Sequence, residues 1–584
     1  MIGFGREIST YSCAKSKEFL LSAEGSYCSQ SLAGNTRKYH GLLVHRGRVL
    51  FSTCDEFLNG ERISVASYAG TVQDKGLRHR YGFSLYPPRF FYAVGGAVLC
   101  KTIEFDGQCH LRYTLWGEGE LRIVPLVTDR SIHDTRGTPD IAGRPTVTGV
   151  QMDHLTLSGD GCTFTPGPNW YRNVWYEEDF ARGFACQEAL YTPGCFETRG
   201  RNWSASLHAA VPGGEPPHPS DHRVPRDPLS CLRTAARDFL VGETLIAGYH
   251  WFPESWGRDT FVSLPGLLLT QEMFREAEVV FRYFARRMKR GLIPNRIPDS
   301  YHSSDATLWF VWALGEYERY GGRRAFIAEM KPYLEEIMAR YGESEIASLD
   351  GDLIRVTPQS TWMDTAWTPR EGKPVEINAL WIHALTYATV CDLETPVRPQ
   401  SARRSFGRFW NEEKGYFCDR IDPVDTTLRP NQIFALSLGL ANPEQETRTL
   451  EVIRKHLLTP YGLRTLAPGE PGYQGCYAGD ASYHNGSVWP WLLGPYVQAS
   501  LHAGGNPNLL RILLQPLFTH LYDAGLGTVS EYFDGDPPHL PRGCIAQAWS
   551  VAEVLRGHRL IEDTIGNNTS LNSSGLAGSY HDPS

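Results

Sequence analysis

The sequence predicts a chain of several domains, in which a β-sandwich precedes a large all-helical domain. Three observations predict it. The chain has 584 residues, too many for one hydrophobic core and enough for two to four domains. Short β-type runs fill the first 211 residues, and apolar residues at helical spacing begin near residue 229.

The N-terminal part carries short runs rich in β-branched and aromatic residues, separated by Gly and Asp, for example at 41–44, 90–94 and 121–127. Regular short strands with turn signals are typical of a β-sandwich, which we predict for residues 1–211. Six prolines follow within residues 212–228. Proline-rich segments seldom enter sheets or helices, so this segment is predicted to be a connector.

Residues 229–563 are predicted to form the helical domain. Apolar side chains recur at helical spacing between Met273 and Met288, and Gly291 supplies a stop signal. Asp305 is placed to cap a further helix. Other predicted helices cover 323–340, 376–391, 431–440, 444–458, 487–502, 507–524 and 543–557.

About a dozen helices without clear strands, in one block of roughly 330 residues, indicate concentric rings of helices or a solenoid. No repeat of fixed period is present, which counts against the solenoid. The last segment, 564–584, is rich in Asn, Ser and Gly. We expect it to be disordered.

The composition excludes several classes of function. A net charge of −8 gives no electrostatic footprint for nucleic acid or anionic membrane. The 13 cysteines lack metal-ligand spacing, so we expect free thiols, a cytoplasmic location and no metal or cofactor. Neither a signal peptide nor an apolar run long enough to span a membrane is expected. The 15 Trp, 28 Tyr and 26 Phe suit a saccharide partner, although large aromatic cores would also explain them.

Polar residues cluster with aromatic residues between the predicted helices. Loops at one end of a rigid scaffold are the usual location of a ligand site. The clusters cover residues 251–260, 361–364, 368–378, 483–491 and 530–535.

Two acids in these clusters suit glycosidic bond cleavage, which needs one protonated carboxyl and one carboxylate. Asp364 follows Trp362 and Met363, and apolar neighbours raise the pKa of a carboxyl. Glu531 precedes two aromatic residues in a short loop. The alternative is structural, with Asp364 capping a helix and Glu531 paired with an Arg.

Other residues of the clusters have the chemistry for binding a sugar. Arg258 and Asp259 suit two hydroxyls of one ring above Trp256, but a buried structural ion pair is an equal alternative. Lys373 and Glu376 also fit a solvated pair on a helix. A lone histidine such as His484 is more often a satisfied core residue.

Several motifs together resemble the glycogen debranching enzyme family, specifically its amylo-α-1,6-glucosidase domain. The N-terminal motif resembles the stand-alone prokaryotic or archaeal form, and the matches extend from about residue 20 to 557. The motifs are Ala-Gly-Asn-Thr-Arg-Lys-Tyr-His-Gly-Leu-Leu (33–43), Trp-Gly-Arg-Asp-Thr (256–260), Pro-Val-Glu-Ile-Asn-Ala-Leu-Trp (374–381), Arg-Pro-Asn-Gln (429–432), Phe-Asp-Gly-Asp (533–536) and Pro-Arg-Gly-Cys-Ile-Ala-Gln-Ala-Trp-Ser (541–550).

The resemblance implies an (α/α)6 barrel behind the β-sandwich and hydrolysis of α-1,6-linked glucosyl stubs of glycogen with inversion. It implies Asp364 as general acid and Glu531 as general base, about 6.5–9.5 Å apart as inverting enzymes require. Asp259 is the rival acid and ranks second, because a neighbouring Arg would lower the pKa of its carboxyl. The implied substrate-binding residues are Trp256, Arg258, Asp259, Asp305, Trp362, Arg370, Lys373, Glu376, Asn378, His484 and Trp489.

Two departures from the family pattern affect these expectations. The interval between Asp364 and Arg370 is short, which bears on the α-1,6 preference, and Asn485 stands where Gln is commoner. The chain has no room for the (β/α)8 glucanotransferase half of the bifunctional enzymes. The alternatives are a glucoamylase- or trehalase-like exo-hydrolase on the same barrel, and a glucan-binding protein without activity.

Overall fold

The structure is a computed structural model that describes residues 2–136, 141, 143–213 and 224–575. The chain forms two compact units. One contains the residues up to Thr234 together with His520–Gly527, and the other contains Ala235–Thr519 and the chain from Thr528 onward. Most of the predicted connector, residues 214–223, lies outside the described residues, as do residues 576–584 of the predicted tail.

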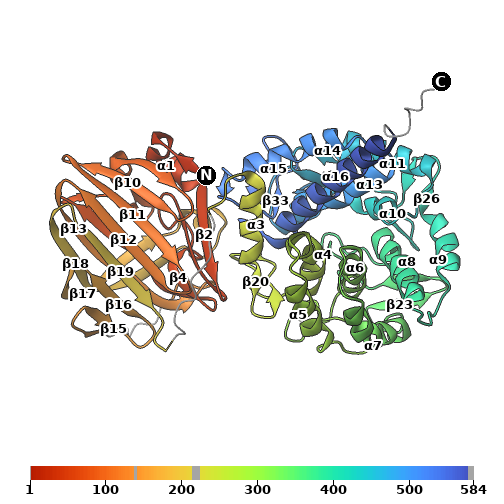
Figure 1. Cartoon of the computed structure of the whole chain (residues 1–584), viewed down its shortest axis with the longest axis horizontal. Coiled ribbons are helices and arrows are strands. Elements are labelled where there is room, and N and C mark those ends of the chain that lie inside the picture. Colours follow the sequence, from red (N-terminus) through yellow and green to blue (C-terminus); the bar gives the residue numbers. More distant parts are fainter. Residues whose placement is uncertain (1, 137–140, 142, 214–223, 576–584) are drawn as a thin grey trace, which may run out of the picture. The chain divides into compact units, whose positions relative to one another are not determined.

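The first unit contains two large, mainly antiparallel sheets, whose strands from the N-terminal part of the chain are red to yellow in Figure 1. One sheet has the order β1 (Gly3–Phe4), β9 (Arg80–Ser84), β10 (Arg89–Val94), β11 (Ala97–Phe105), β12 (Cys109–Trp116), β19 (Ser204–Ala210), β16 (Thr156–Asp160), β15 (Gly149–Gln151) and β14 (Arg144–Pro145). The other has the order β32 (Ala524–Gly525), β2 (Lys17–Ala23), β3 (Ser26–Ser31), β4 (Gly41–His45), β5 (Arg48–Leu58), β13 (Glu118–Ser131), β18 (Gln187–Arg201), β17 (Thr163–Trp175), β7 (Ala66–Tyr68) and β8 (Thr71–Gln73), with β6 (Glu61–Arg62) paired to β5.

Aromatic and charged side chains connect the two sheets. The ring of Phe19, on β2, packs against Phe83 and Phe90 on β9 and β10, with centroids 6.4 and 6.1 Å away. Between β5 and β11, the buried Glu56 carboxylate forms an ion pair with Lys101 at 2.8 Å. Buried charges need such partners. The sheet-rich N-terminal region predicted from the sequence is confirmed.

One strand of this unit comes from a distant part of the sequence. β32 pairs in parallel with β2, and the backbone N–H of Leu526 donates to the carbonyl of Glu18 at 2.8 Å. The sequence predicted a helix over 507–524, whereas the structure has α14 (Pro507–Leu513), α15 (Gln515–His520) and then the strand. A two-residue strand is too short to leave a periodic pattern, so the prediction missed it.

The second unit is helical, as predicted. Among its described residues, six helices form a closed ring in which each contacts the next: α4 with α6, α6 with α8, α8 with α10, α10 with α13, α13 with α16, and α16 with α4. Figure 1 shows them in green to blue. They are α4 (Gly257–Leu267), α6 (Ala306–Arg319), α8 (Val375–Val390), α10 (Ile433–Ser437), α13 (Leu493–His502) and α16 (Ala548–Gly575).

Further helices pack outside this ring: α7 contacts α6 and α8, α9 contacts α8, and α14 contacts α16. The two sets differ in sequence as their environments require. α8 is apolar and buried on nearly every side, whereas α11 is polar and starts with a capping box between Asn442 and Gln445. Besides α14, the outer helices are α5 (Phe274–Ala285), α7 (Arg324–Arg340), α9 (Pro399–Phe406) and α11 (Pro443–His456).

The helix ends differ from the sequence predictions in two ways. Short strands precede several helices. For example, β31 (Val488–Trp489) replaces the start of the helix predicted at 487. It belongs to a five-stranded sheet with β29 (Leu458–Thr459), β30 (Gly462–Arg464), β33 (Tyr532–Phe533) and β34 (Pro541–Arg542). At the other end, α16 continues to Gly575, although 564 onward was predicted to be disordered. Extending a helix that is already nucleated costs little, even through Asn and Ser.

Candidate active site

The loops that precede the ring helices enclose a pocket of about 150 Å³ in the helical unit. Eight of the predicted site residues line it, from four of the five clusters named above. The lining residues are Ala247, Phe252, Trp256, Arg258, Asp259, Trp362, Asp364, Tyr483, His484, Trp489, Glu531, Gln547 and Trp549.

Asp364 faces this pocket with 37% of its side chain exposed. Its Oδ2 accepts a hydrogen bond from Nη1 of Arg258 at 3.2 Å. Burial raises the pKa of Asp364, and the nearby Arg258 charge opposes that shift. A carboxyl that holds its proton above the ordinary range and still faces the pocket can donate that proton to a ligand.

Arg258 holds Asp364 in place from behind. The guanidinium Nε donates to both carboxylate oxygens of Asp305 at 2.8 Å, and Nη2 donates to the carbonyl of Thr361 at 2.9 Å. Asp305 stands at the N-cap of α6, as predicted, but its side chain makes no capping hydrogen bond. Asp305 therefore reaches the pocket only through Arg258.

Glu531 is only 2% exposed, and both of its carboxylate oxygens accept hydrogen bonds. Tyr483 donates its hydroxyl to Oε1, and the backbone N–H of Cys544 donates to Oε2 at 2.8 Å. Burial raises the pKa of Tyr483 well above 10, so its phenol remains a donor. Two fixed donors on a buried carboxylate stabilise the anion and orient it, as a general base requires.

Asp259 is a third acid in the same pocket. Burial raises its pKa to about 7, the Arg258 charge opposes this shift, and the charges of Glu531 and Asp364 add to it. The charge of Arg258 does lower the pKa of Asp259, as the sequence argument held, but burial outweighs it. The Arg258 guanidinium bonds to Asp305 and Asp364, while the Asp259 carboxyl accepts a 3.3 Å hydrogen bond from Gln547.

Replacing Asp259 with Asn is expected to change the pH dependence of stability. Because the folded-state pKa of about 7 lies above the unfolded value of 3.8, this group stabilises the fold fully below about pH 4 and ceases to do so as the pH rises through 7. The free energy of unfolding of the wild type, relative to Asp259→Asn, should fall between pH 4 and 7 in urea titrations. Parallel curves for the two proteins would contradict the raised pKa.

The remaining walls combine aromatic rings with polar atoms. Trp362 packs edge-on against Trp489 and His484, with centroids 5.5 and 5.4 Å away. Burial lowers the pKa of His484 well below 6.5, so its ring is neutral. Within the described chain, three buried polar atoms of the lining have no hydrogen-bond partner: Nε1 of Trp256, Oε1 of Gln547 and Nε1 of Trp549. Such atoms suit a ligand with many hydroxyls.

Besides Asp305, four predicted binding residues lie outside the pocket lining. Arg370 donates to both carboxylate oxygens of Glu376 and of Asp419, and its Nη1 also donates to Oγ1 of Thr361 at 3.2 Å. Lys373 forms ion pairs with Asp350 and Asp422, and the Asn378 side chain bonds to the backbone of Ile354 and Pro374. The side chains of Lys373 and Asn378 thus bond to groups that do not line the pocket.

The Arg370 group supports the segment that carries Asp364. Asp419 accepts a hydrogen bond from Asn431 at 2.7 Å, and Asn431 accepts one from the indole of Trp362 at 2.7 Å. Through this chain Arg370 fixes the Trp362 ring, and through Thr361 it fixes the adjoining backbone. Contact of Arg370 and Glu376 with substrate stays a prediction. In this structure their hydrogen bonds support the segment that carries Asp364.

Five of the lining residues were not predicted as site residues: Ala247, Phe252, Tyr483, Gln547 and Trp549. All but Ala247 stand within a motif or cluster already identified. Tyr483 precedes His484, and Gln547 and Trp549 end the Pro541–Ser550 motif. The signal was therefore present, but nothing in the sequence says which members of a cluster face inward.

Gly543 allows the close approach on which the Glu531 geometry depends. Its φ of +70° is unfavourable for other residues, and a Cβ there would lie 2.2 Å from Oε2 of Glu531. Gly543→Ala should displace this carboxylate and lower kcat by about 100-fold. Gly504→Ala is the matched control, because Gly504 has φ +77° but open space around it. Equal kcat for both variants would show that Glu531 tolerates the shift.

The pocket combines acids with aromatic walls and with polar atoms left unpaired within the described chain, the features of a site for a ligand with many hydroxyls. Residues 234–556 match the family described as Amylo-alpha-1,6-glucosidase, and residues 17–204 match Glycogen debranching enzyme N terminal. The chain belongs to the glycogen debranching enzyme family, a family of glycoside hydrolases. The resemblance noted in the sequence is thereby confirmed.

Individual relatives are distant. The glycogen debranching enzyme of Saccharomyces cerevisiae is 25% identical over 373 residues, which cover 42% of this chain and 24% of that protein. The solabiose phosphorylase of Paenibacillus borealis is 24% identical over 37% of this chain and 31% of its own. The chain spans about a quarter to a third of the length of the curated relatives it matches.

Solved structures with a similar arrangement include the GH63 mannosylglycerate hydrolase of Thermus thermophilus in complex with Tris and D-glycerate. It shares 13% sequence identity at a TM-score of 0.43, over 56% of this chain and 100% of that one. The glucose complex of the same hydrolase gives 14% identity and a TM-score of 0.42, over 56% of this chain and 100% of that one. None of the described helices of the present chain combines the length and the apolar character that crossing a membrane requires.

Proposed function

We propose that this protein is an inverting glycoside hydrolase that cleaves α-1,6-glucosidic branch points of glycogen or a related α-glucan. The observation that carries the proposal is that Asp364 and Glu531 line one small pocket, from loops 167 positions apart in the sequence (531 minus 364). Membership of a family described by this activity supports the choice of linkage.

In the proposed reaction, Asp364 protonates the glycosidic oxygen while Glu531 takes a proton from the attacking water on the opposite face. The raised pKa of Asp364 supports its role as donor, and the two donors on Glu531 support its role as base. Asp259, Gln547 and the indole N–H groups would bind sugar hydroxyls. A carboxyl separation of about 6.5–9.5 Å remains the prediction for this mechanism.

Two structural features extend the proposal. The closed ring of helices with further helices outside it supports an (α/α)6 barrel, and the two large sheets support a β-sandwich domain that precedes it in the sequence. All 13 cysteines are free thiols, which supports a reducing, cytoplasmic location. We propose α-glucan as the partner, and neither nucleic acid nor membrane.

The test is a time-resolved NMR measurement of the sugar released from a branched limit dextrin. The proposal predicts free glucose that appears first as the β-anomer, because inversion at an α-linkage gives β. An α-anomer would overturn inversion. Faster cleavage of linear maltooligosaccharide or trehalose would indicate the exo-hydrolase alternative, release of glucose phosphate only with added phosphate would indicate a phosphorylase, and binding without turnover a glucan-binding protein.

A further inference from the structure

A second hollow, of about 610 Å³, lies on the sheet of the N-terminal unit that contains β17 and β18. Its lining residues are distant in sequence from those of the pocket. We call it the β17–β18 trough. Its lining comes from these two strands and from the segment after β13. The lining residues are Thr135, Arg136, Trp170, Arg172, Asn173, Gln187, Glu188 and Ala189.

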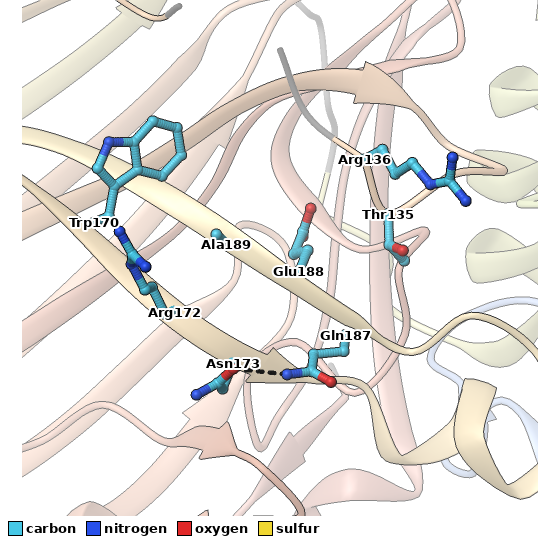
Figure 2. Close-up of a pocket in the computed structure, with 8 residues that line it drawn as sticks. All are labelled: Thr135, Arg136, Trp170, Arg172, Asn173, Gln187, Glu188 and Ala189. Carbon is cyan, nitrogen blue, oxygen red and sulfur yellow. Dashed lines mark hydrogen bonds between the residues drawn. The ribbon is translucent and has the colours of Figure 1, made fainter. Parts of the chain in front are cut away.

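The trough arises from the alternation of side chains along paired strands. Trp170 and Arg172 are two positions apart on β17, and Gln187 and Ala189 are two apart on β18, so each pair faces one side of the sheet. Ala189 is exposed and small, and it forms the floor. Figure 2 shows it between the β17 side chains and the segment that carries Arg136. An irregularity between Tyr171 and Val174 shifts the register and brings Asn173 to the same rim.

The walls carry groups that suit a chain of sugars. Trp170 is partly exposed and packs beside Tyr191, its cross-strand partner on β18, with centroids 5.3 Å apart. The side-chain amide of Gln187 donates to Oδ1 of Asn173 at 2.7 Å, which leaves the Asn173 amino group and the Gln187 carbonyl for other partners. An indole face beside a donor and an acceptor matches the apolar face and hydroxyl rim of a glucosyl unit.

Among the described residues that line the trough, none offers a carboxyl group for catalysis. Glu188 is the one acidic residue among them, and its side chain is fully buried. Both of its oxygens are occupied by Arg130, at 2.6 and 3.0 Å, and Oε1 also accepts from Tyr176. By contrast, Arg136 and Arg172 are exposed. This arrangement fits binding without turnover.

We propose that the β17–β18 trough is a non-catalytic binding site for an α-glucan chain, which holds the polymeric substrate during catalysis elsewhere. The inference rests on the proposed function for the identity of the polymer. Its value would lie in avidity, because a second contact with the same polymer raises the effective concentration of branch points at the pocket.

The test compares Trp170→Ala and Gln187→Ala with Trp116→Ala in the full chain. Trp116 is the matched control, since it is 51% exposed on β12, in the other sheet. Affinity electrophoresis in glycogen-containing gels should show about tenfold weaker binding for the two trough variants and no weakening for the control. Activity on a short, singly branched oligosaccharide, which offers no long glucan chain for the trough to hold, should match the wild type.

Three results would overturn the proposal. They are wild-type glycogen affinity in both trough variants, equal weakening in the Trp116→Ala control, and a loss of activity on the short oligosaccharide that parallels the loss on glycogen. Binding of heparin that weakens with salt and disappears in Arg172→Ala, with glycogen binding unchanged, would assign the trough to an anionic ligand instead. Electrophoresis needs no turnover, so failure of the proposed hydrolysis would not be mistaken for failure of this site.

Discussion

Glu531→Gln and Asp364→Asn should each lower kcat on a branched dextrin by about 100- to 10,000-fold, the usual contribution of a positioned acid or base. The two losses should depend differently on the leaving group. α-Glucosyl fluoride releases fluoride without protonation, so Asp364→Asn should recover most of its rate on this substrate. Glu531→Gln should remain slow, because water still needs a base. Steady-state kinetics on both substrates measure the difference.

Asp259→Asn separates the two candidate acids. If Asp259 binds hydroxyls of the reacting sugar, its variant should be slow on the dextrin and on the fluoride alike, since both contain that sugar. Recovery on the fluoride in Asp259→Asn, together with no recovery in Asp364→Asn, would transfer the role of acid to Asp259. Circular dichroism of each variant shows whether the fold is retained.

Arg370→Met should cost about 3–5 kcal/mol of stability, the usual result of removing one partner from a buried ionic group. The substitution leaves Glu376 and Asp419 buried, each 1% exposed, without their shared cation. Burial already raises the pKa of Glu376 while Arg370 opposes that shift, so removing Arg370 should raise it further. Carboxyls with a raised folded pKa stabilise at low pH, so the loss should be larger at pH 8 than at pH 5.

Arg559→Met is the control for this measurement. Its ion pair with Asp563 is exposed, at 46% and 44%, and such pairs contribute below about 1 kcal/mol. Urea unfolding of both variants gives the comparison. If Arg370→Met unfolds like Arg559→Met, the buried group is not needed for stability, and the predicted contact of Arg370 with substrate becomes the better explanation of the residue.

Local patterns in the sequence account for much of the architecture. Short apolar runs ended by Gly and Asp predicted a sheet-rich first part, and helical spacing predicted the second; both are confirmed. The motifs identified the family, because several motifs in the same order along two chains indicate a common ancestor. Asp364, Glu531, Trp256 and His484 were named from the clusters of polar and aromatic residues between the predicted helices, and all four line one pocket.

Local patterns could not predict contacts between distant segments. Sequence spacing does not reveal that residues 524–525 extend a sheet beginning near residue 17, since a parallel pair needs no local signal. Likewise, Arg370, Lys373, Glu376 and Asn378 belong to a polar cluster that looks like the others, but their side chains bond to the supporting structure. The sequence does not distinguish a charged residue that contacts a ligand from one that pairs with a buried residue.

The sequence by itself determined which residue types stand between the helices. These residue types indicate the family and its chemistry. Only the tertiary structure decided which of the charged groups contact one another and how their pKa values shift. Burial raises the pKa of Asp259 to about 7 and outweighs the opposing charge of Arg258, whose guanidinium bonds to Asp305 and Asp364. The reason is physical: burial and distances between side chains determine a pKa, and both arise only when the chain has folded.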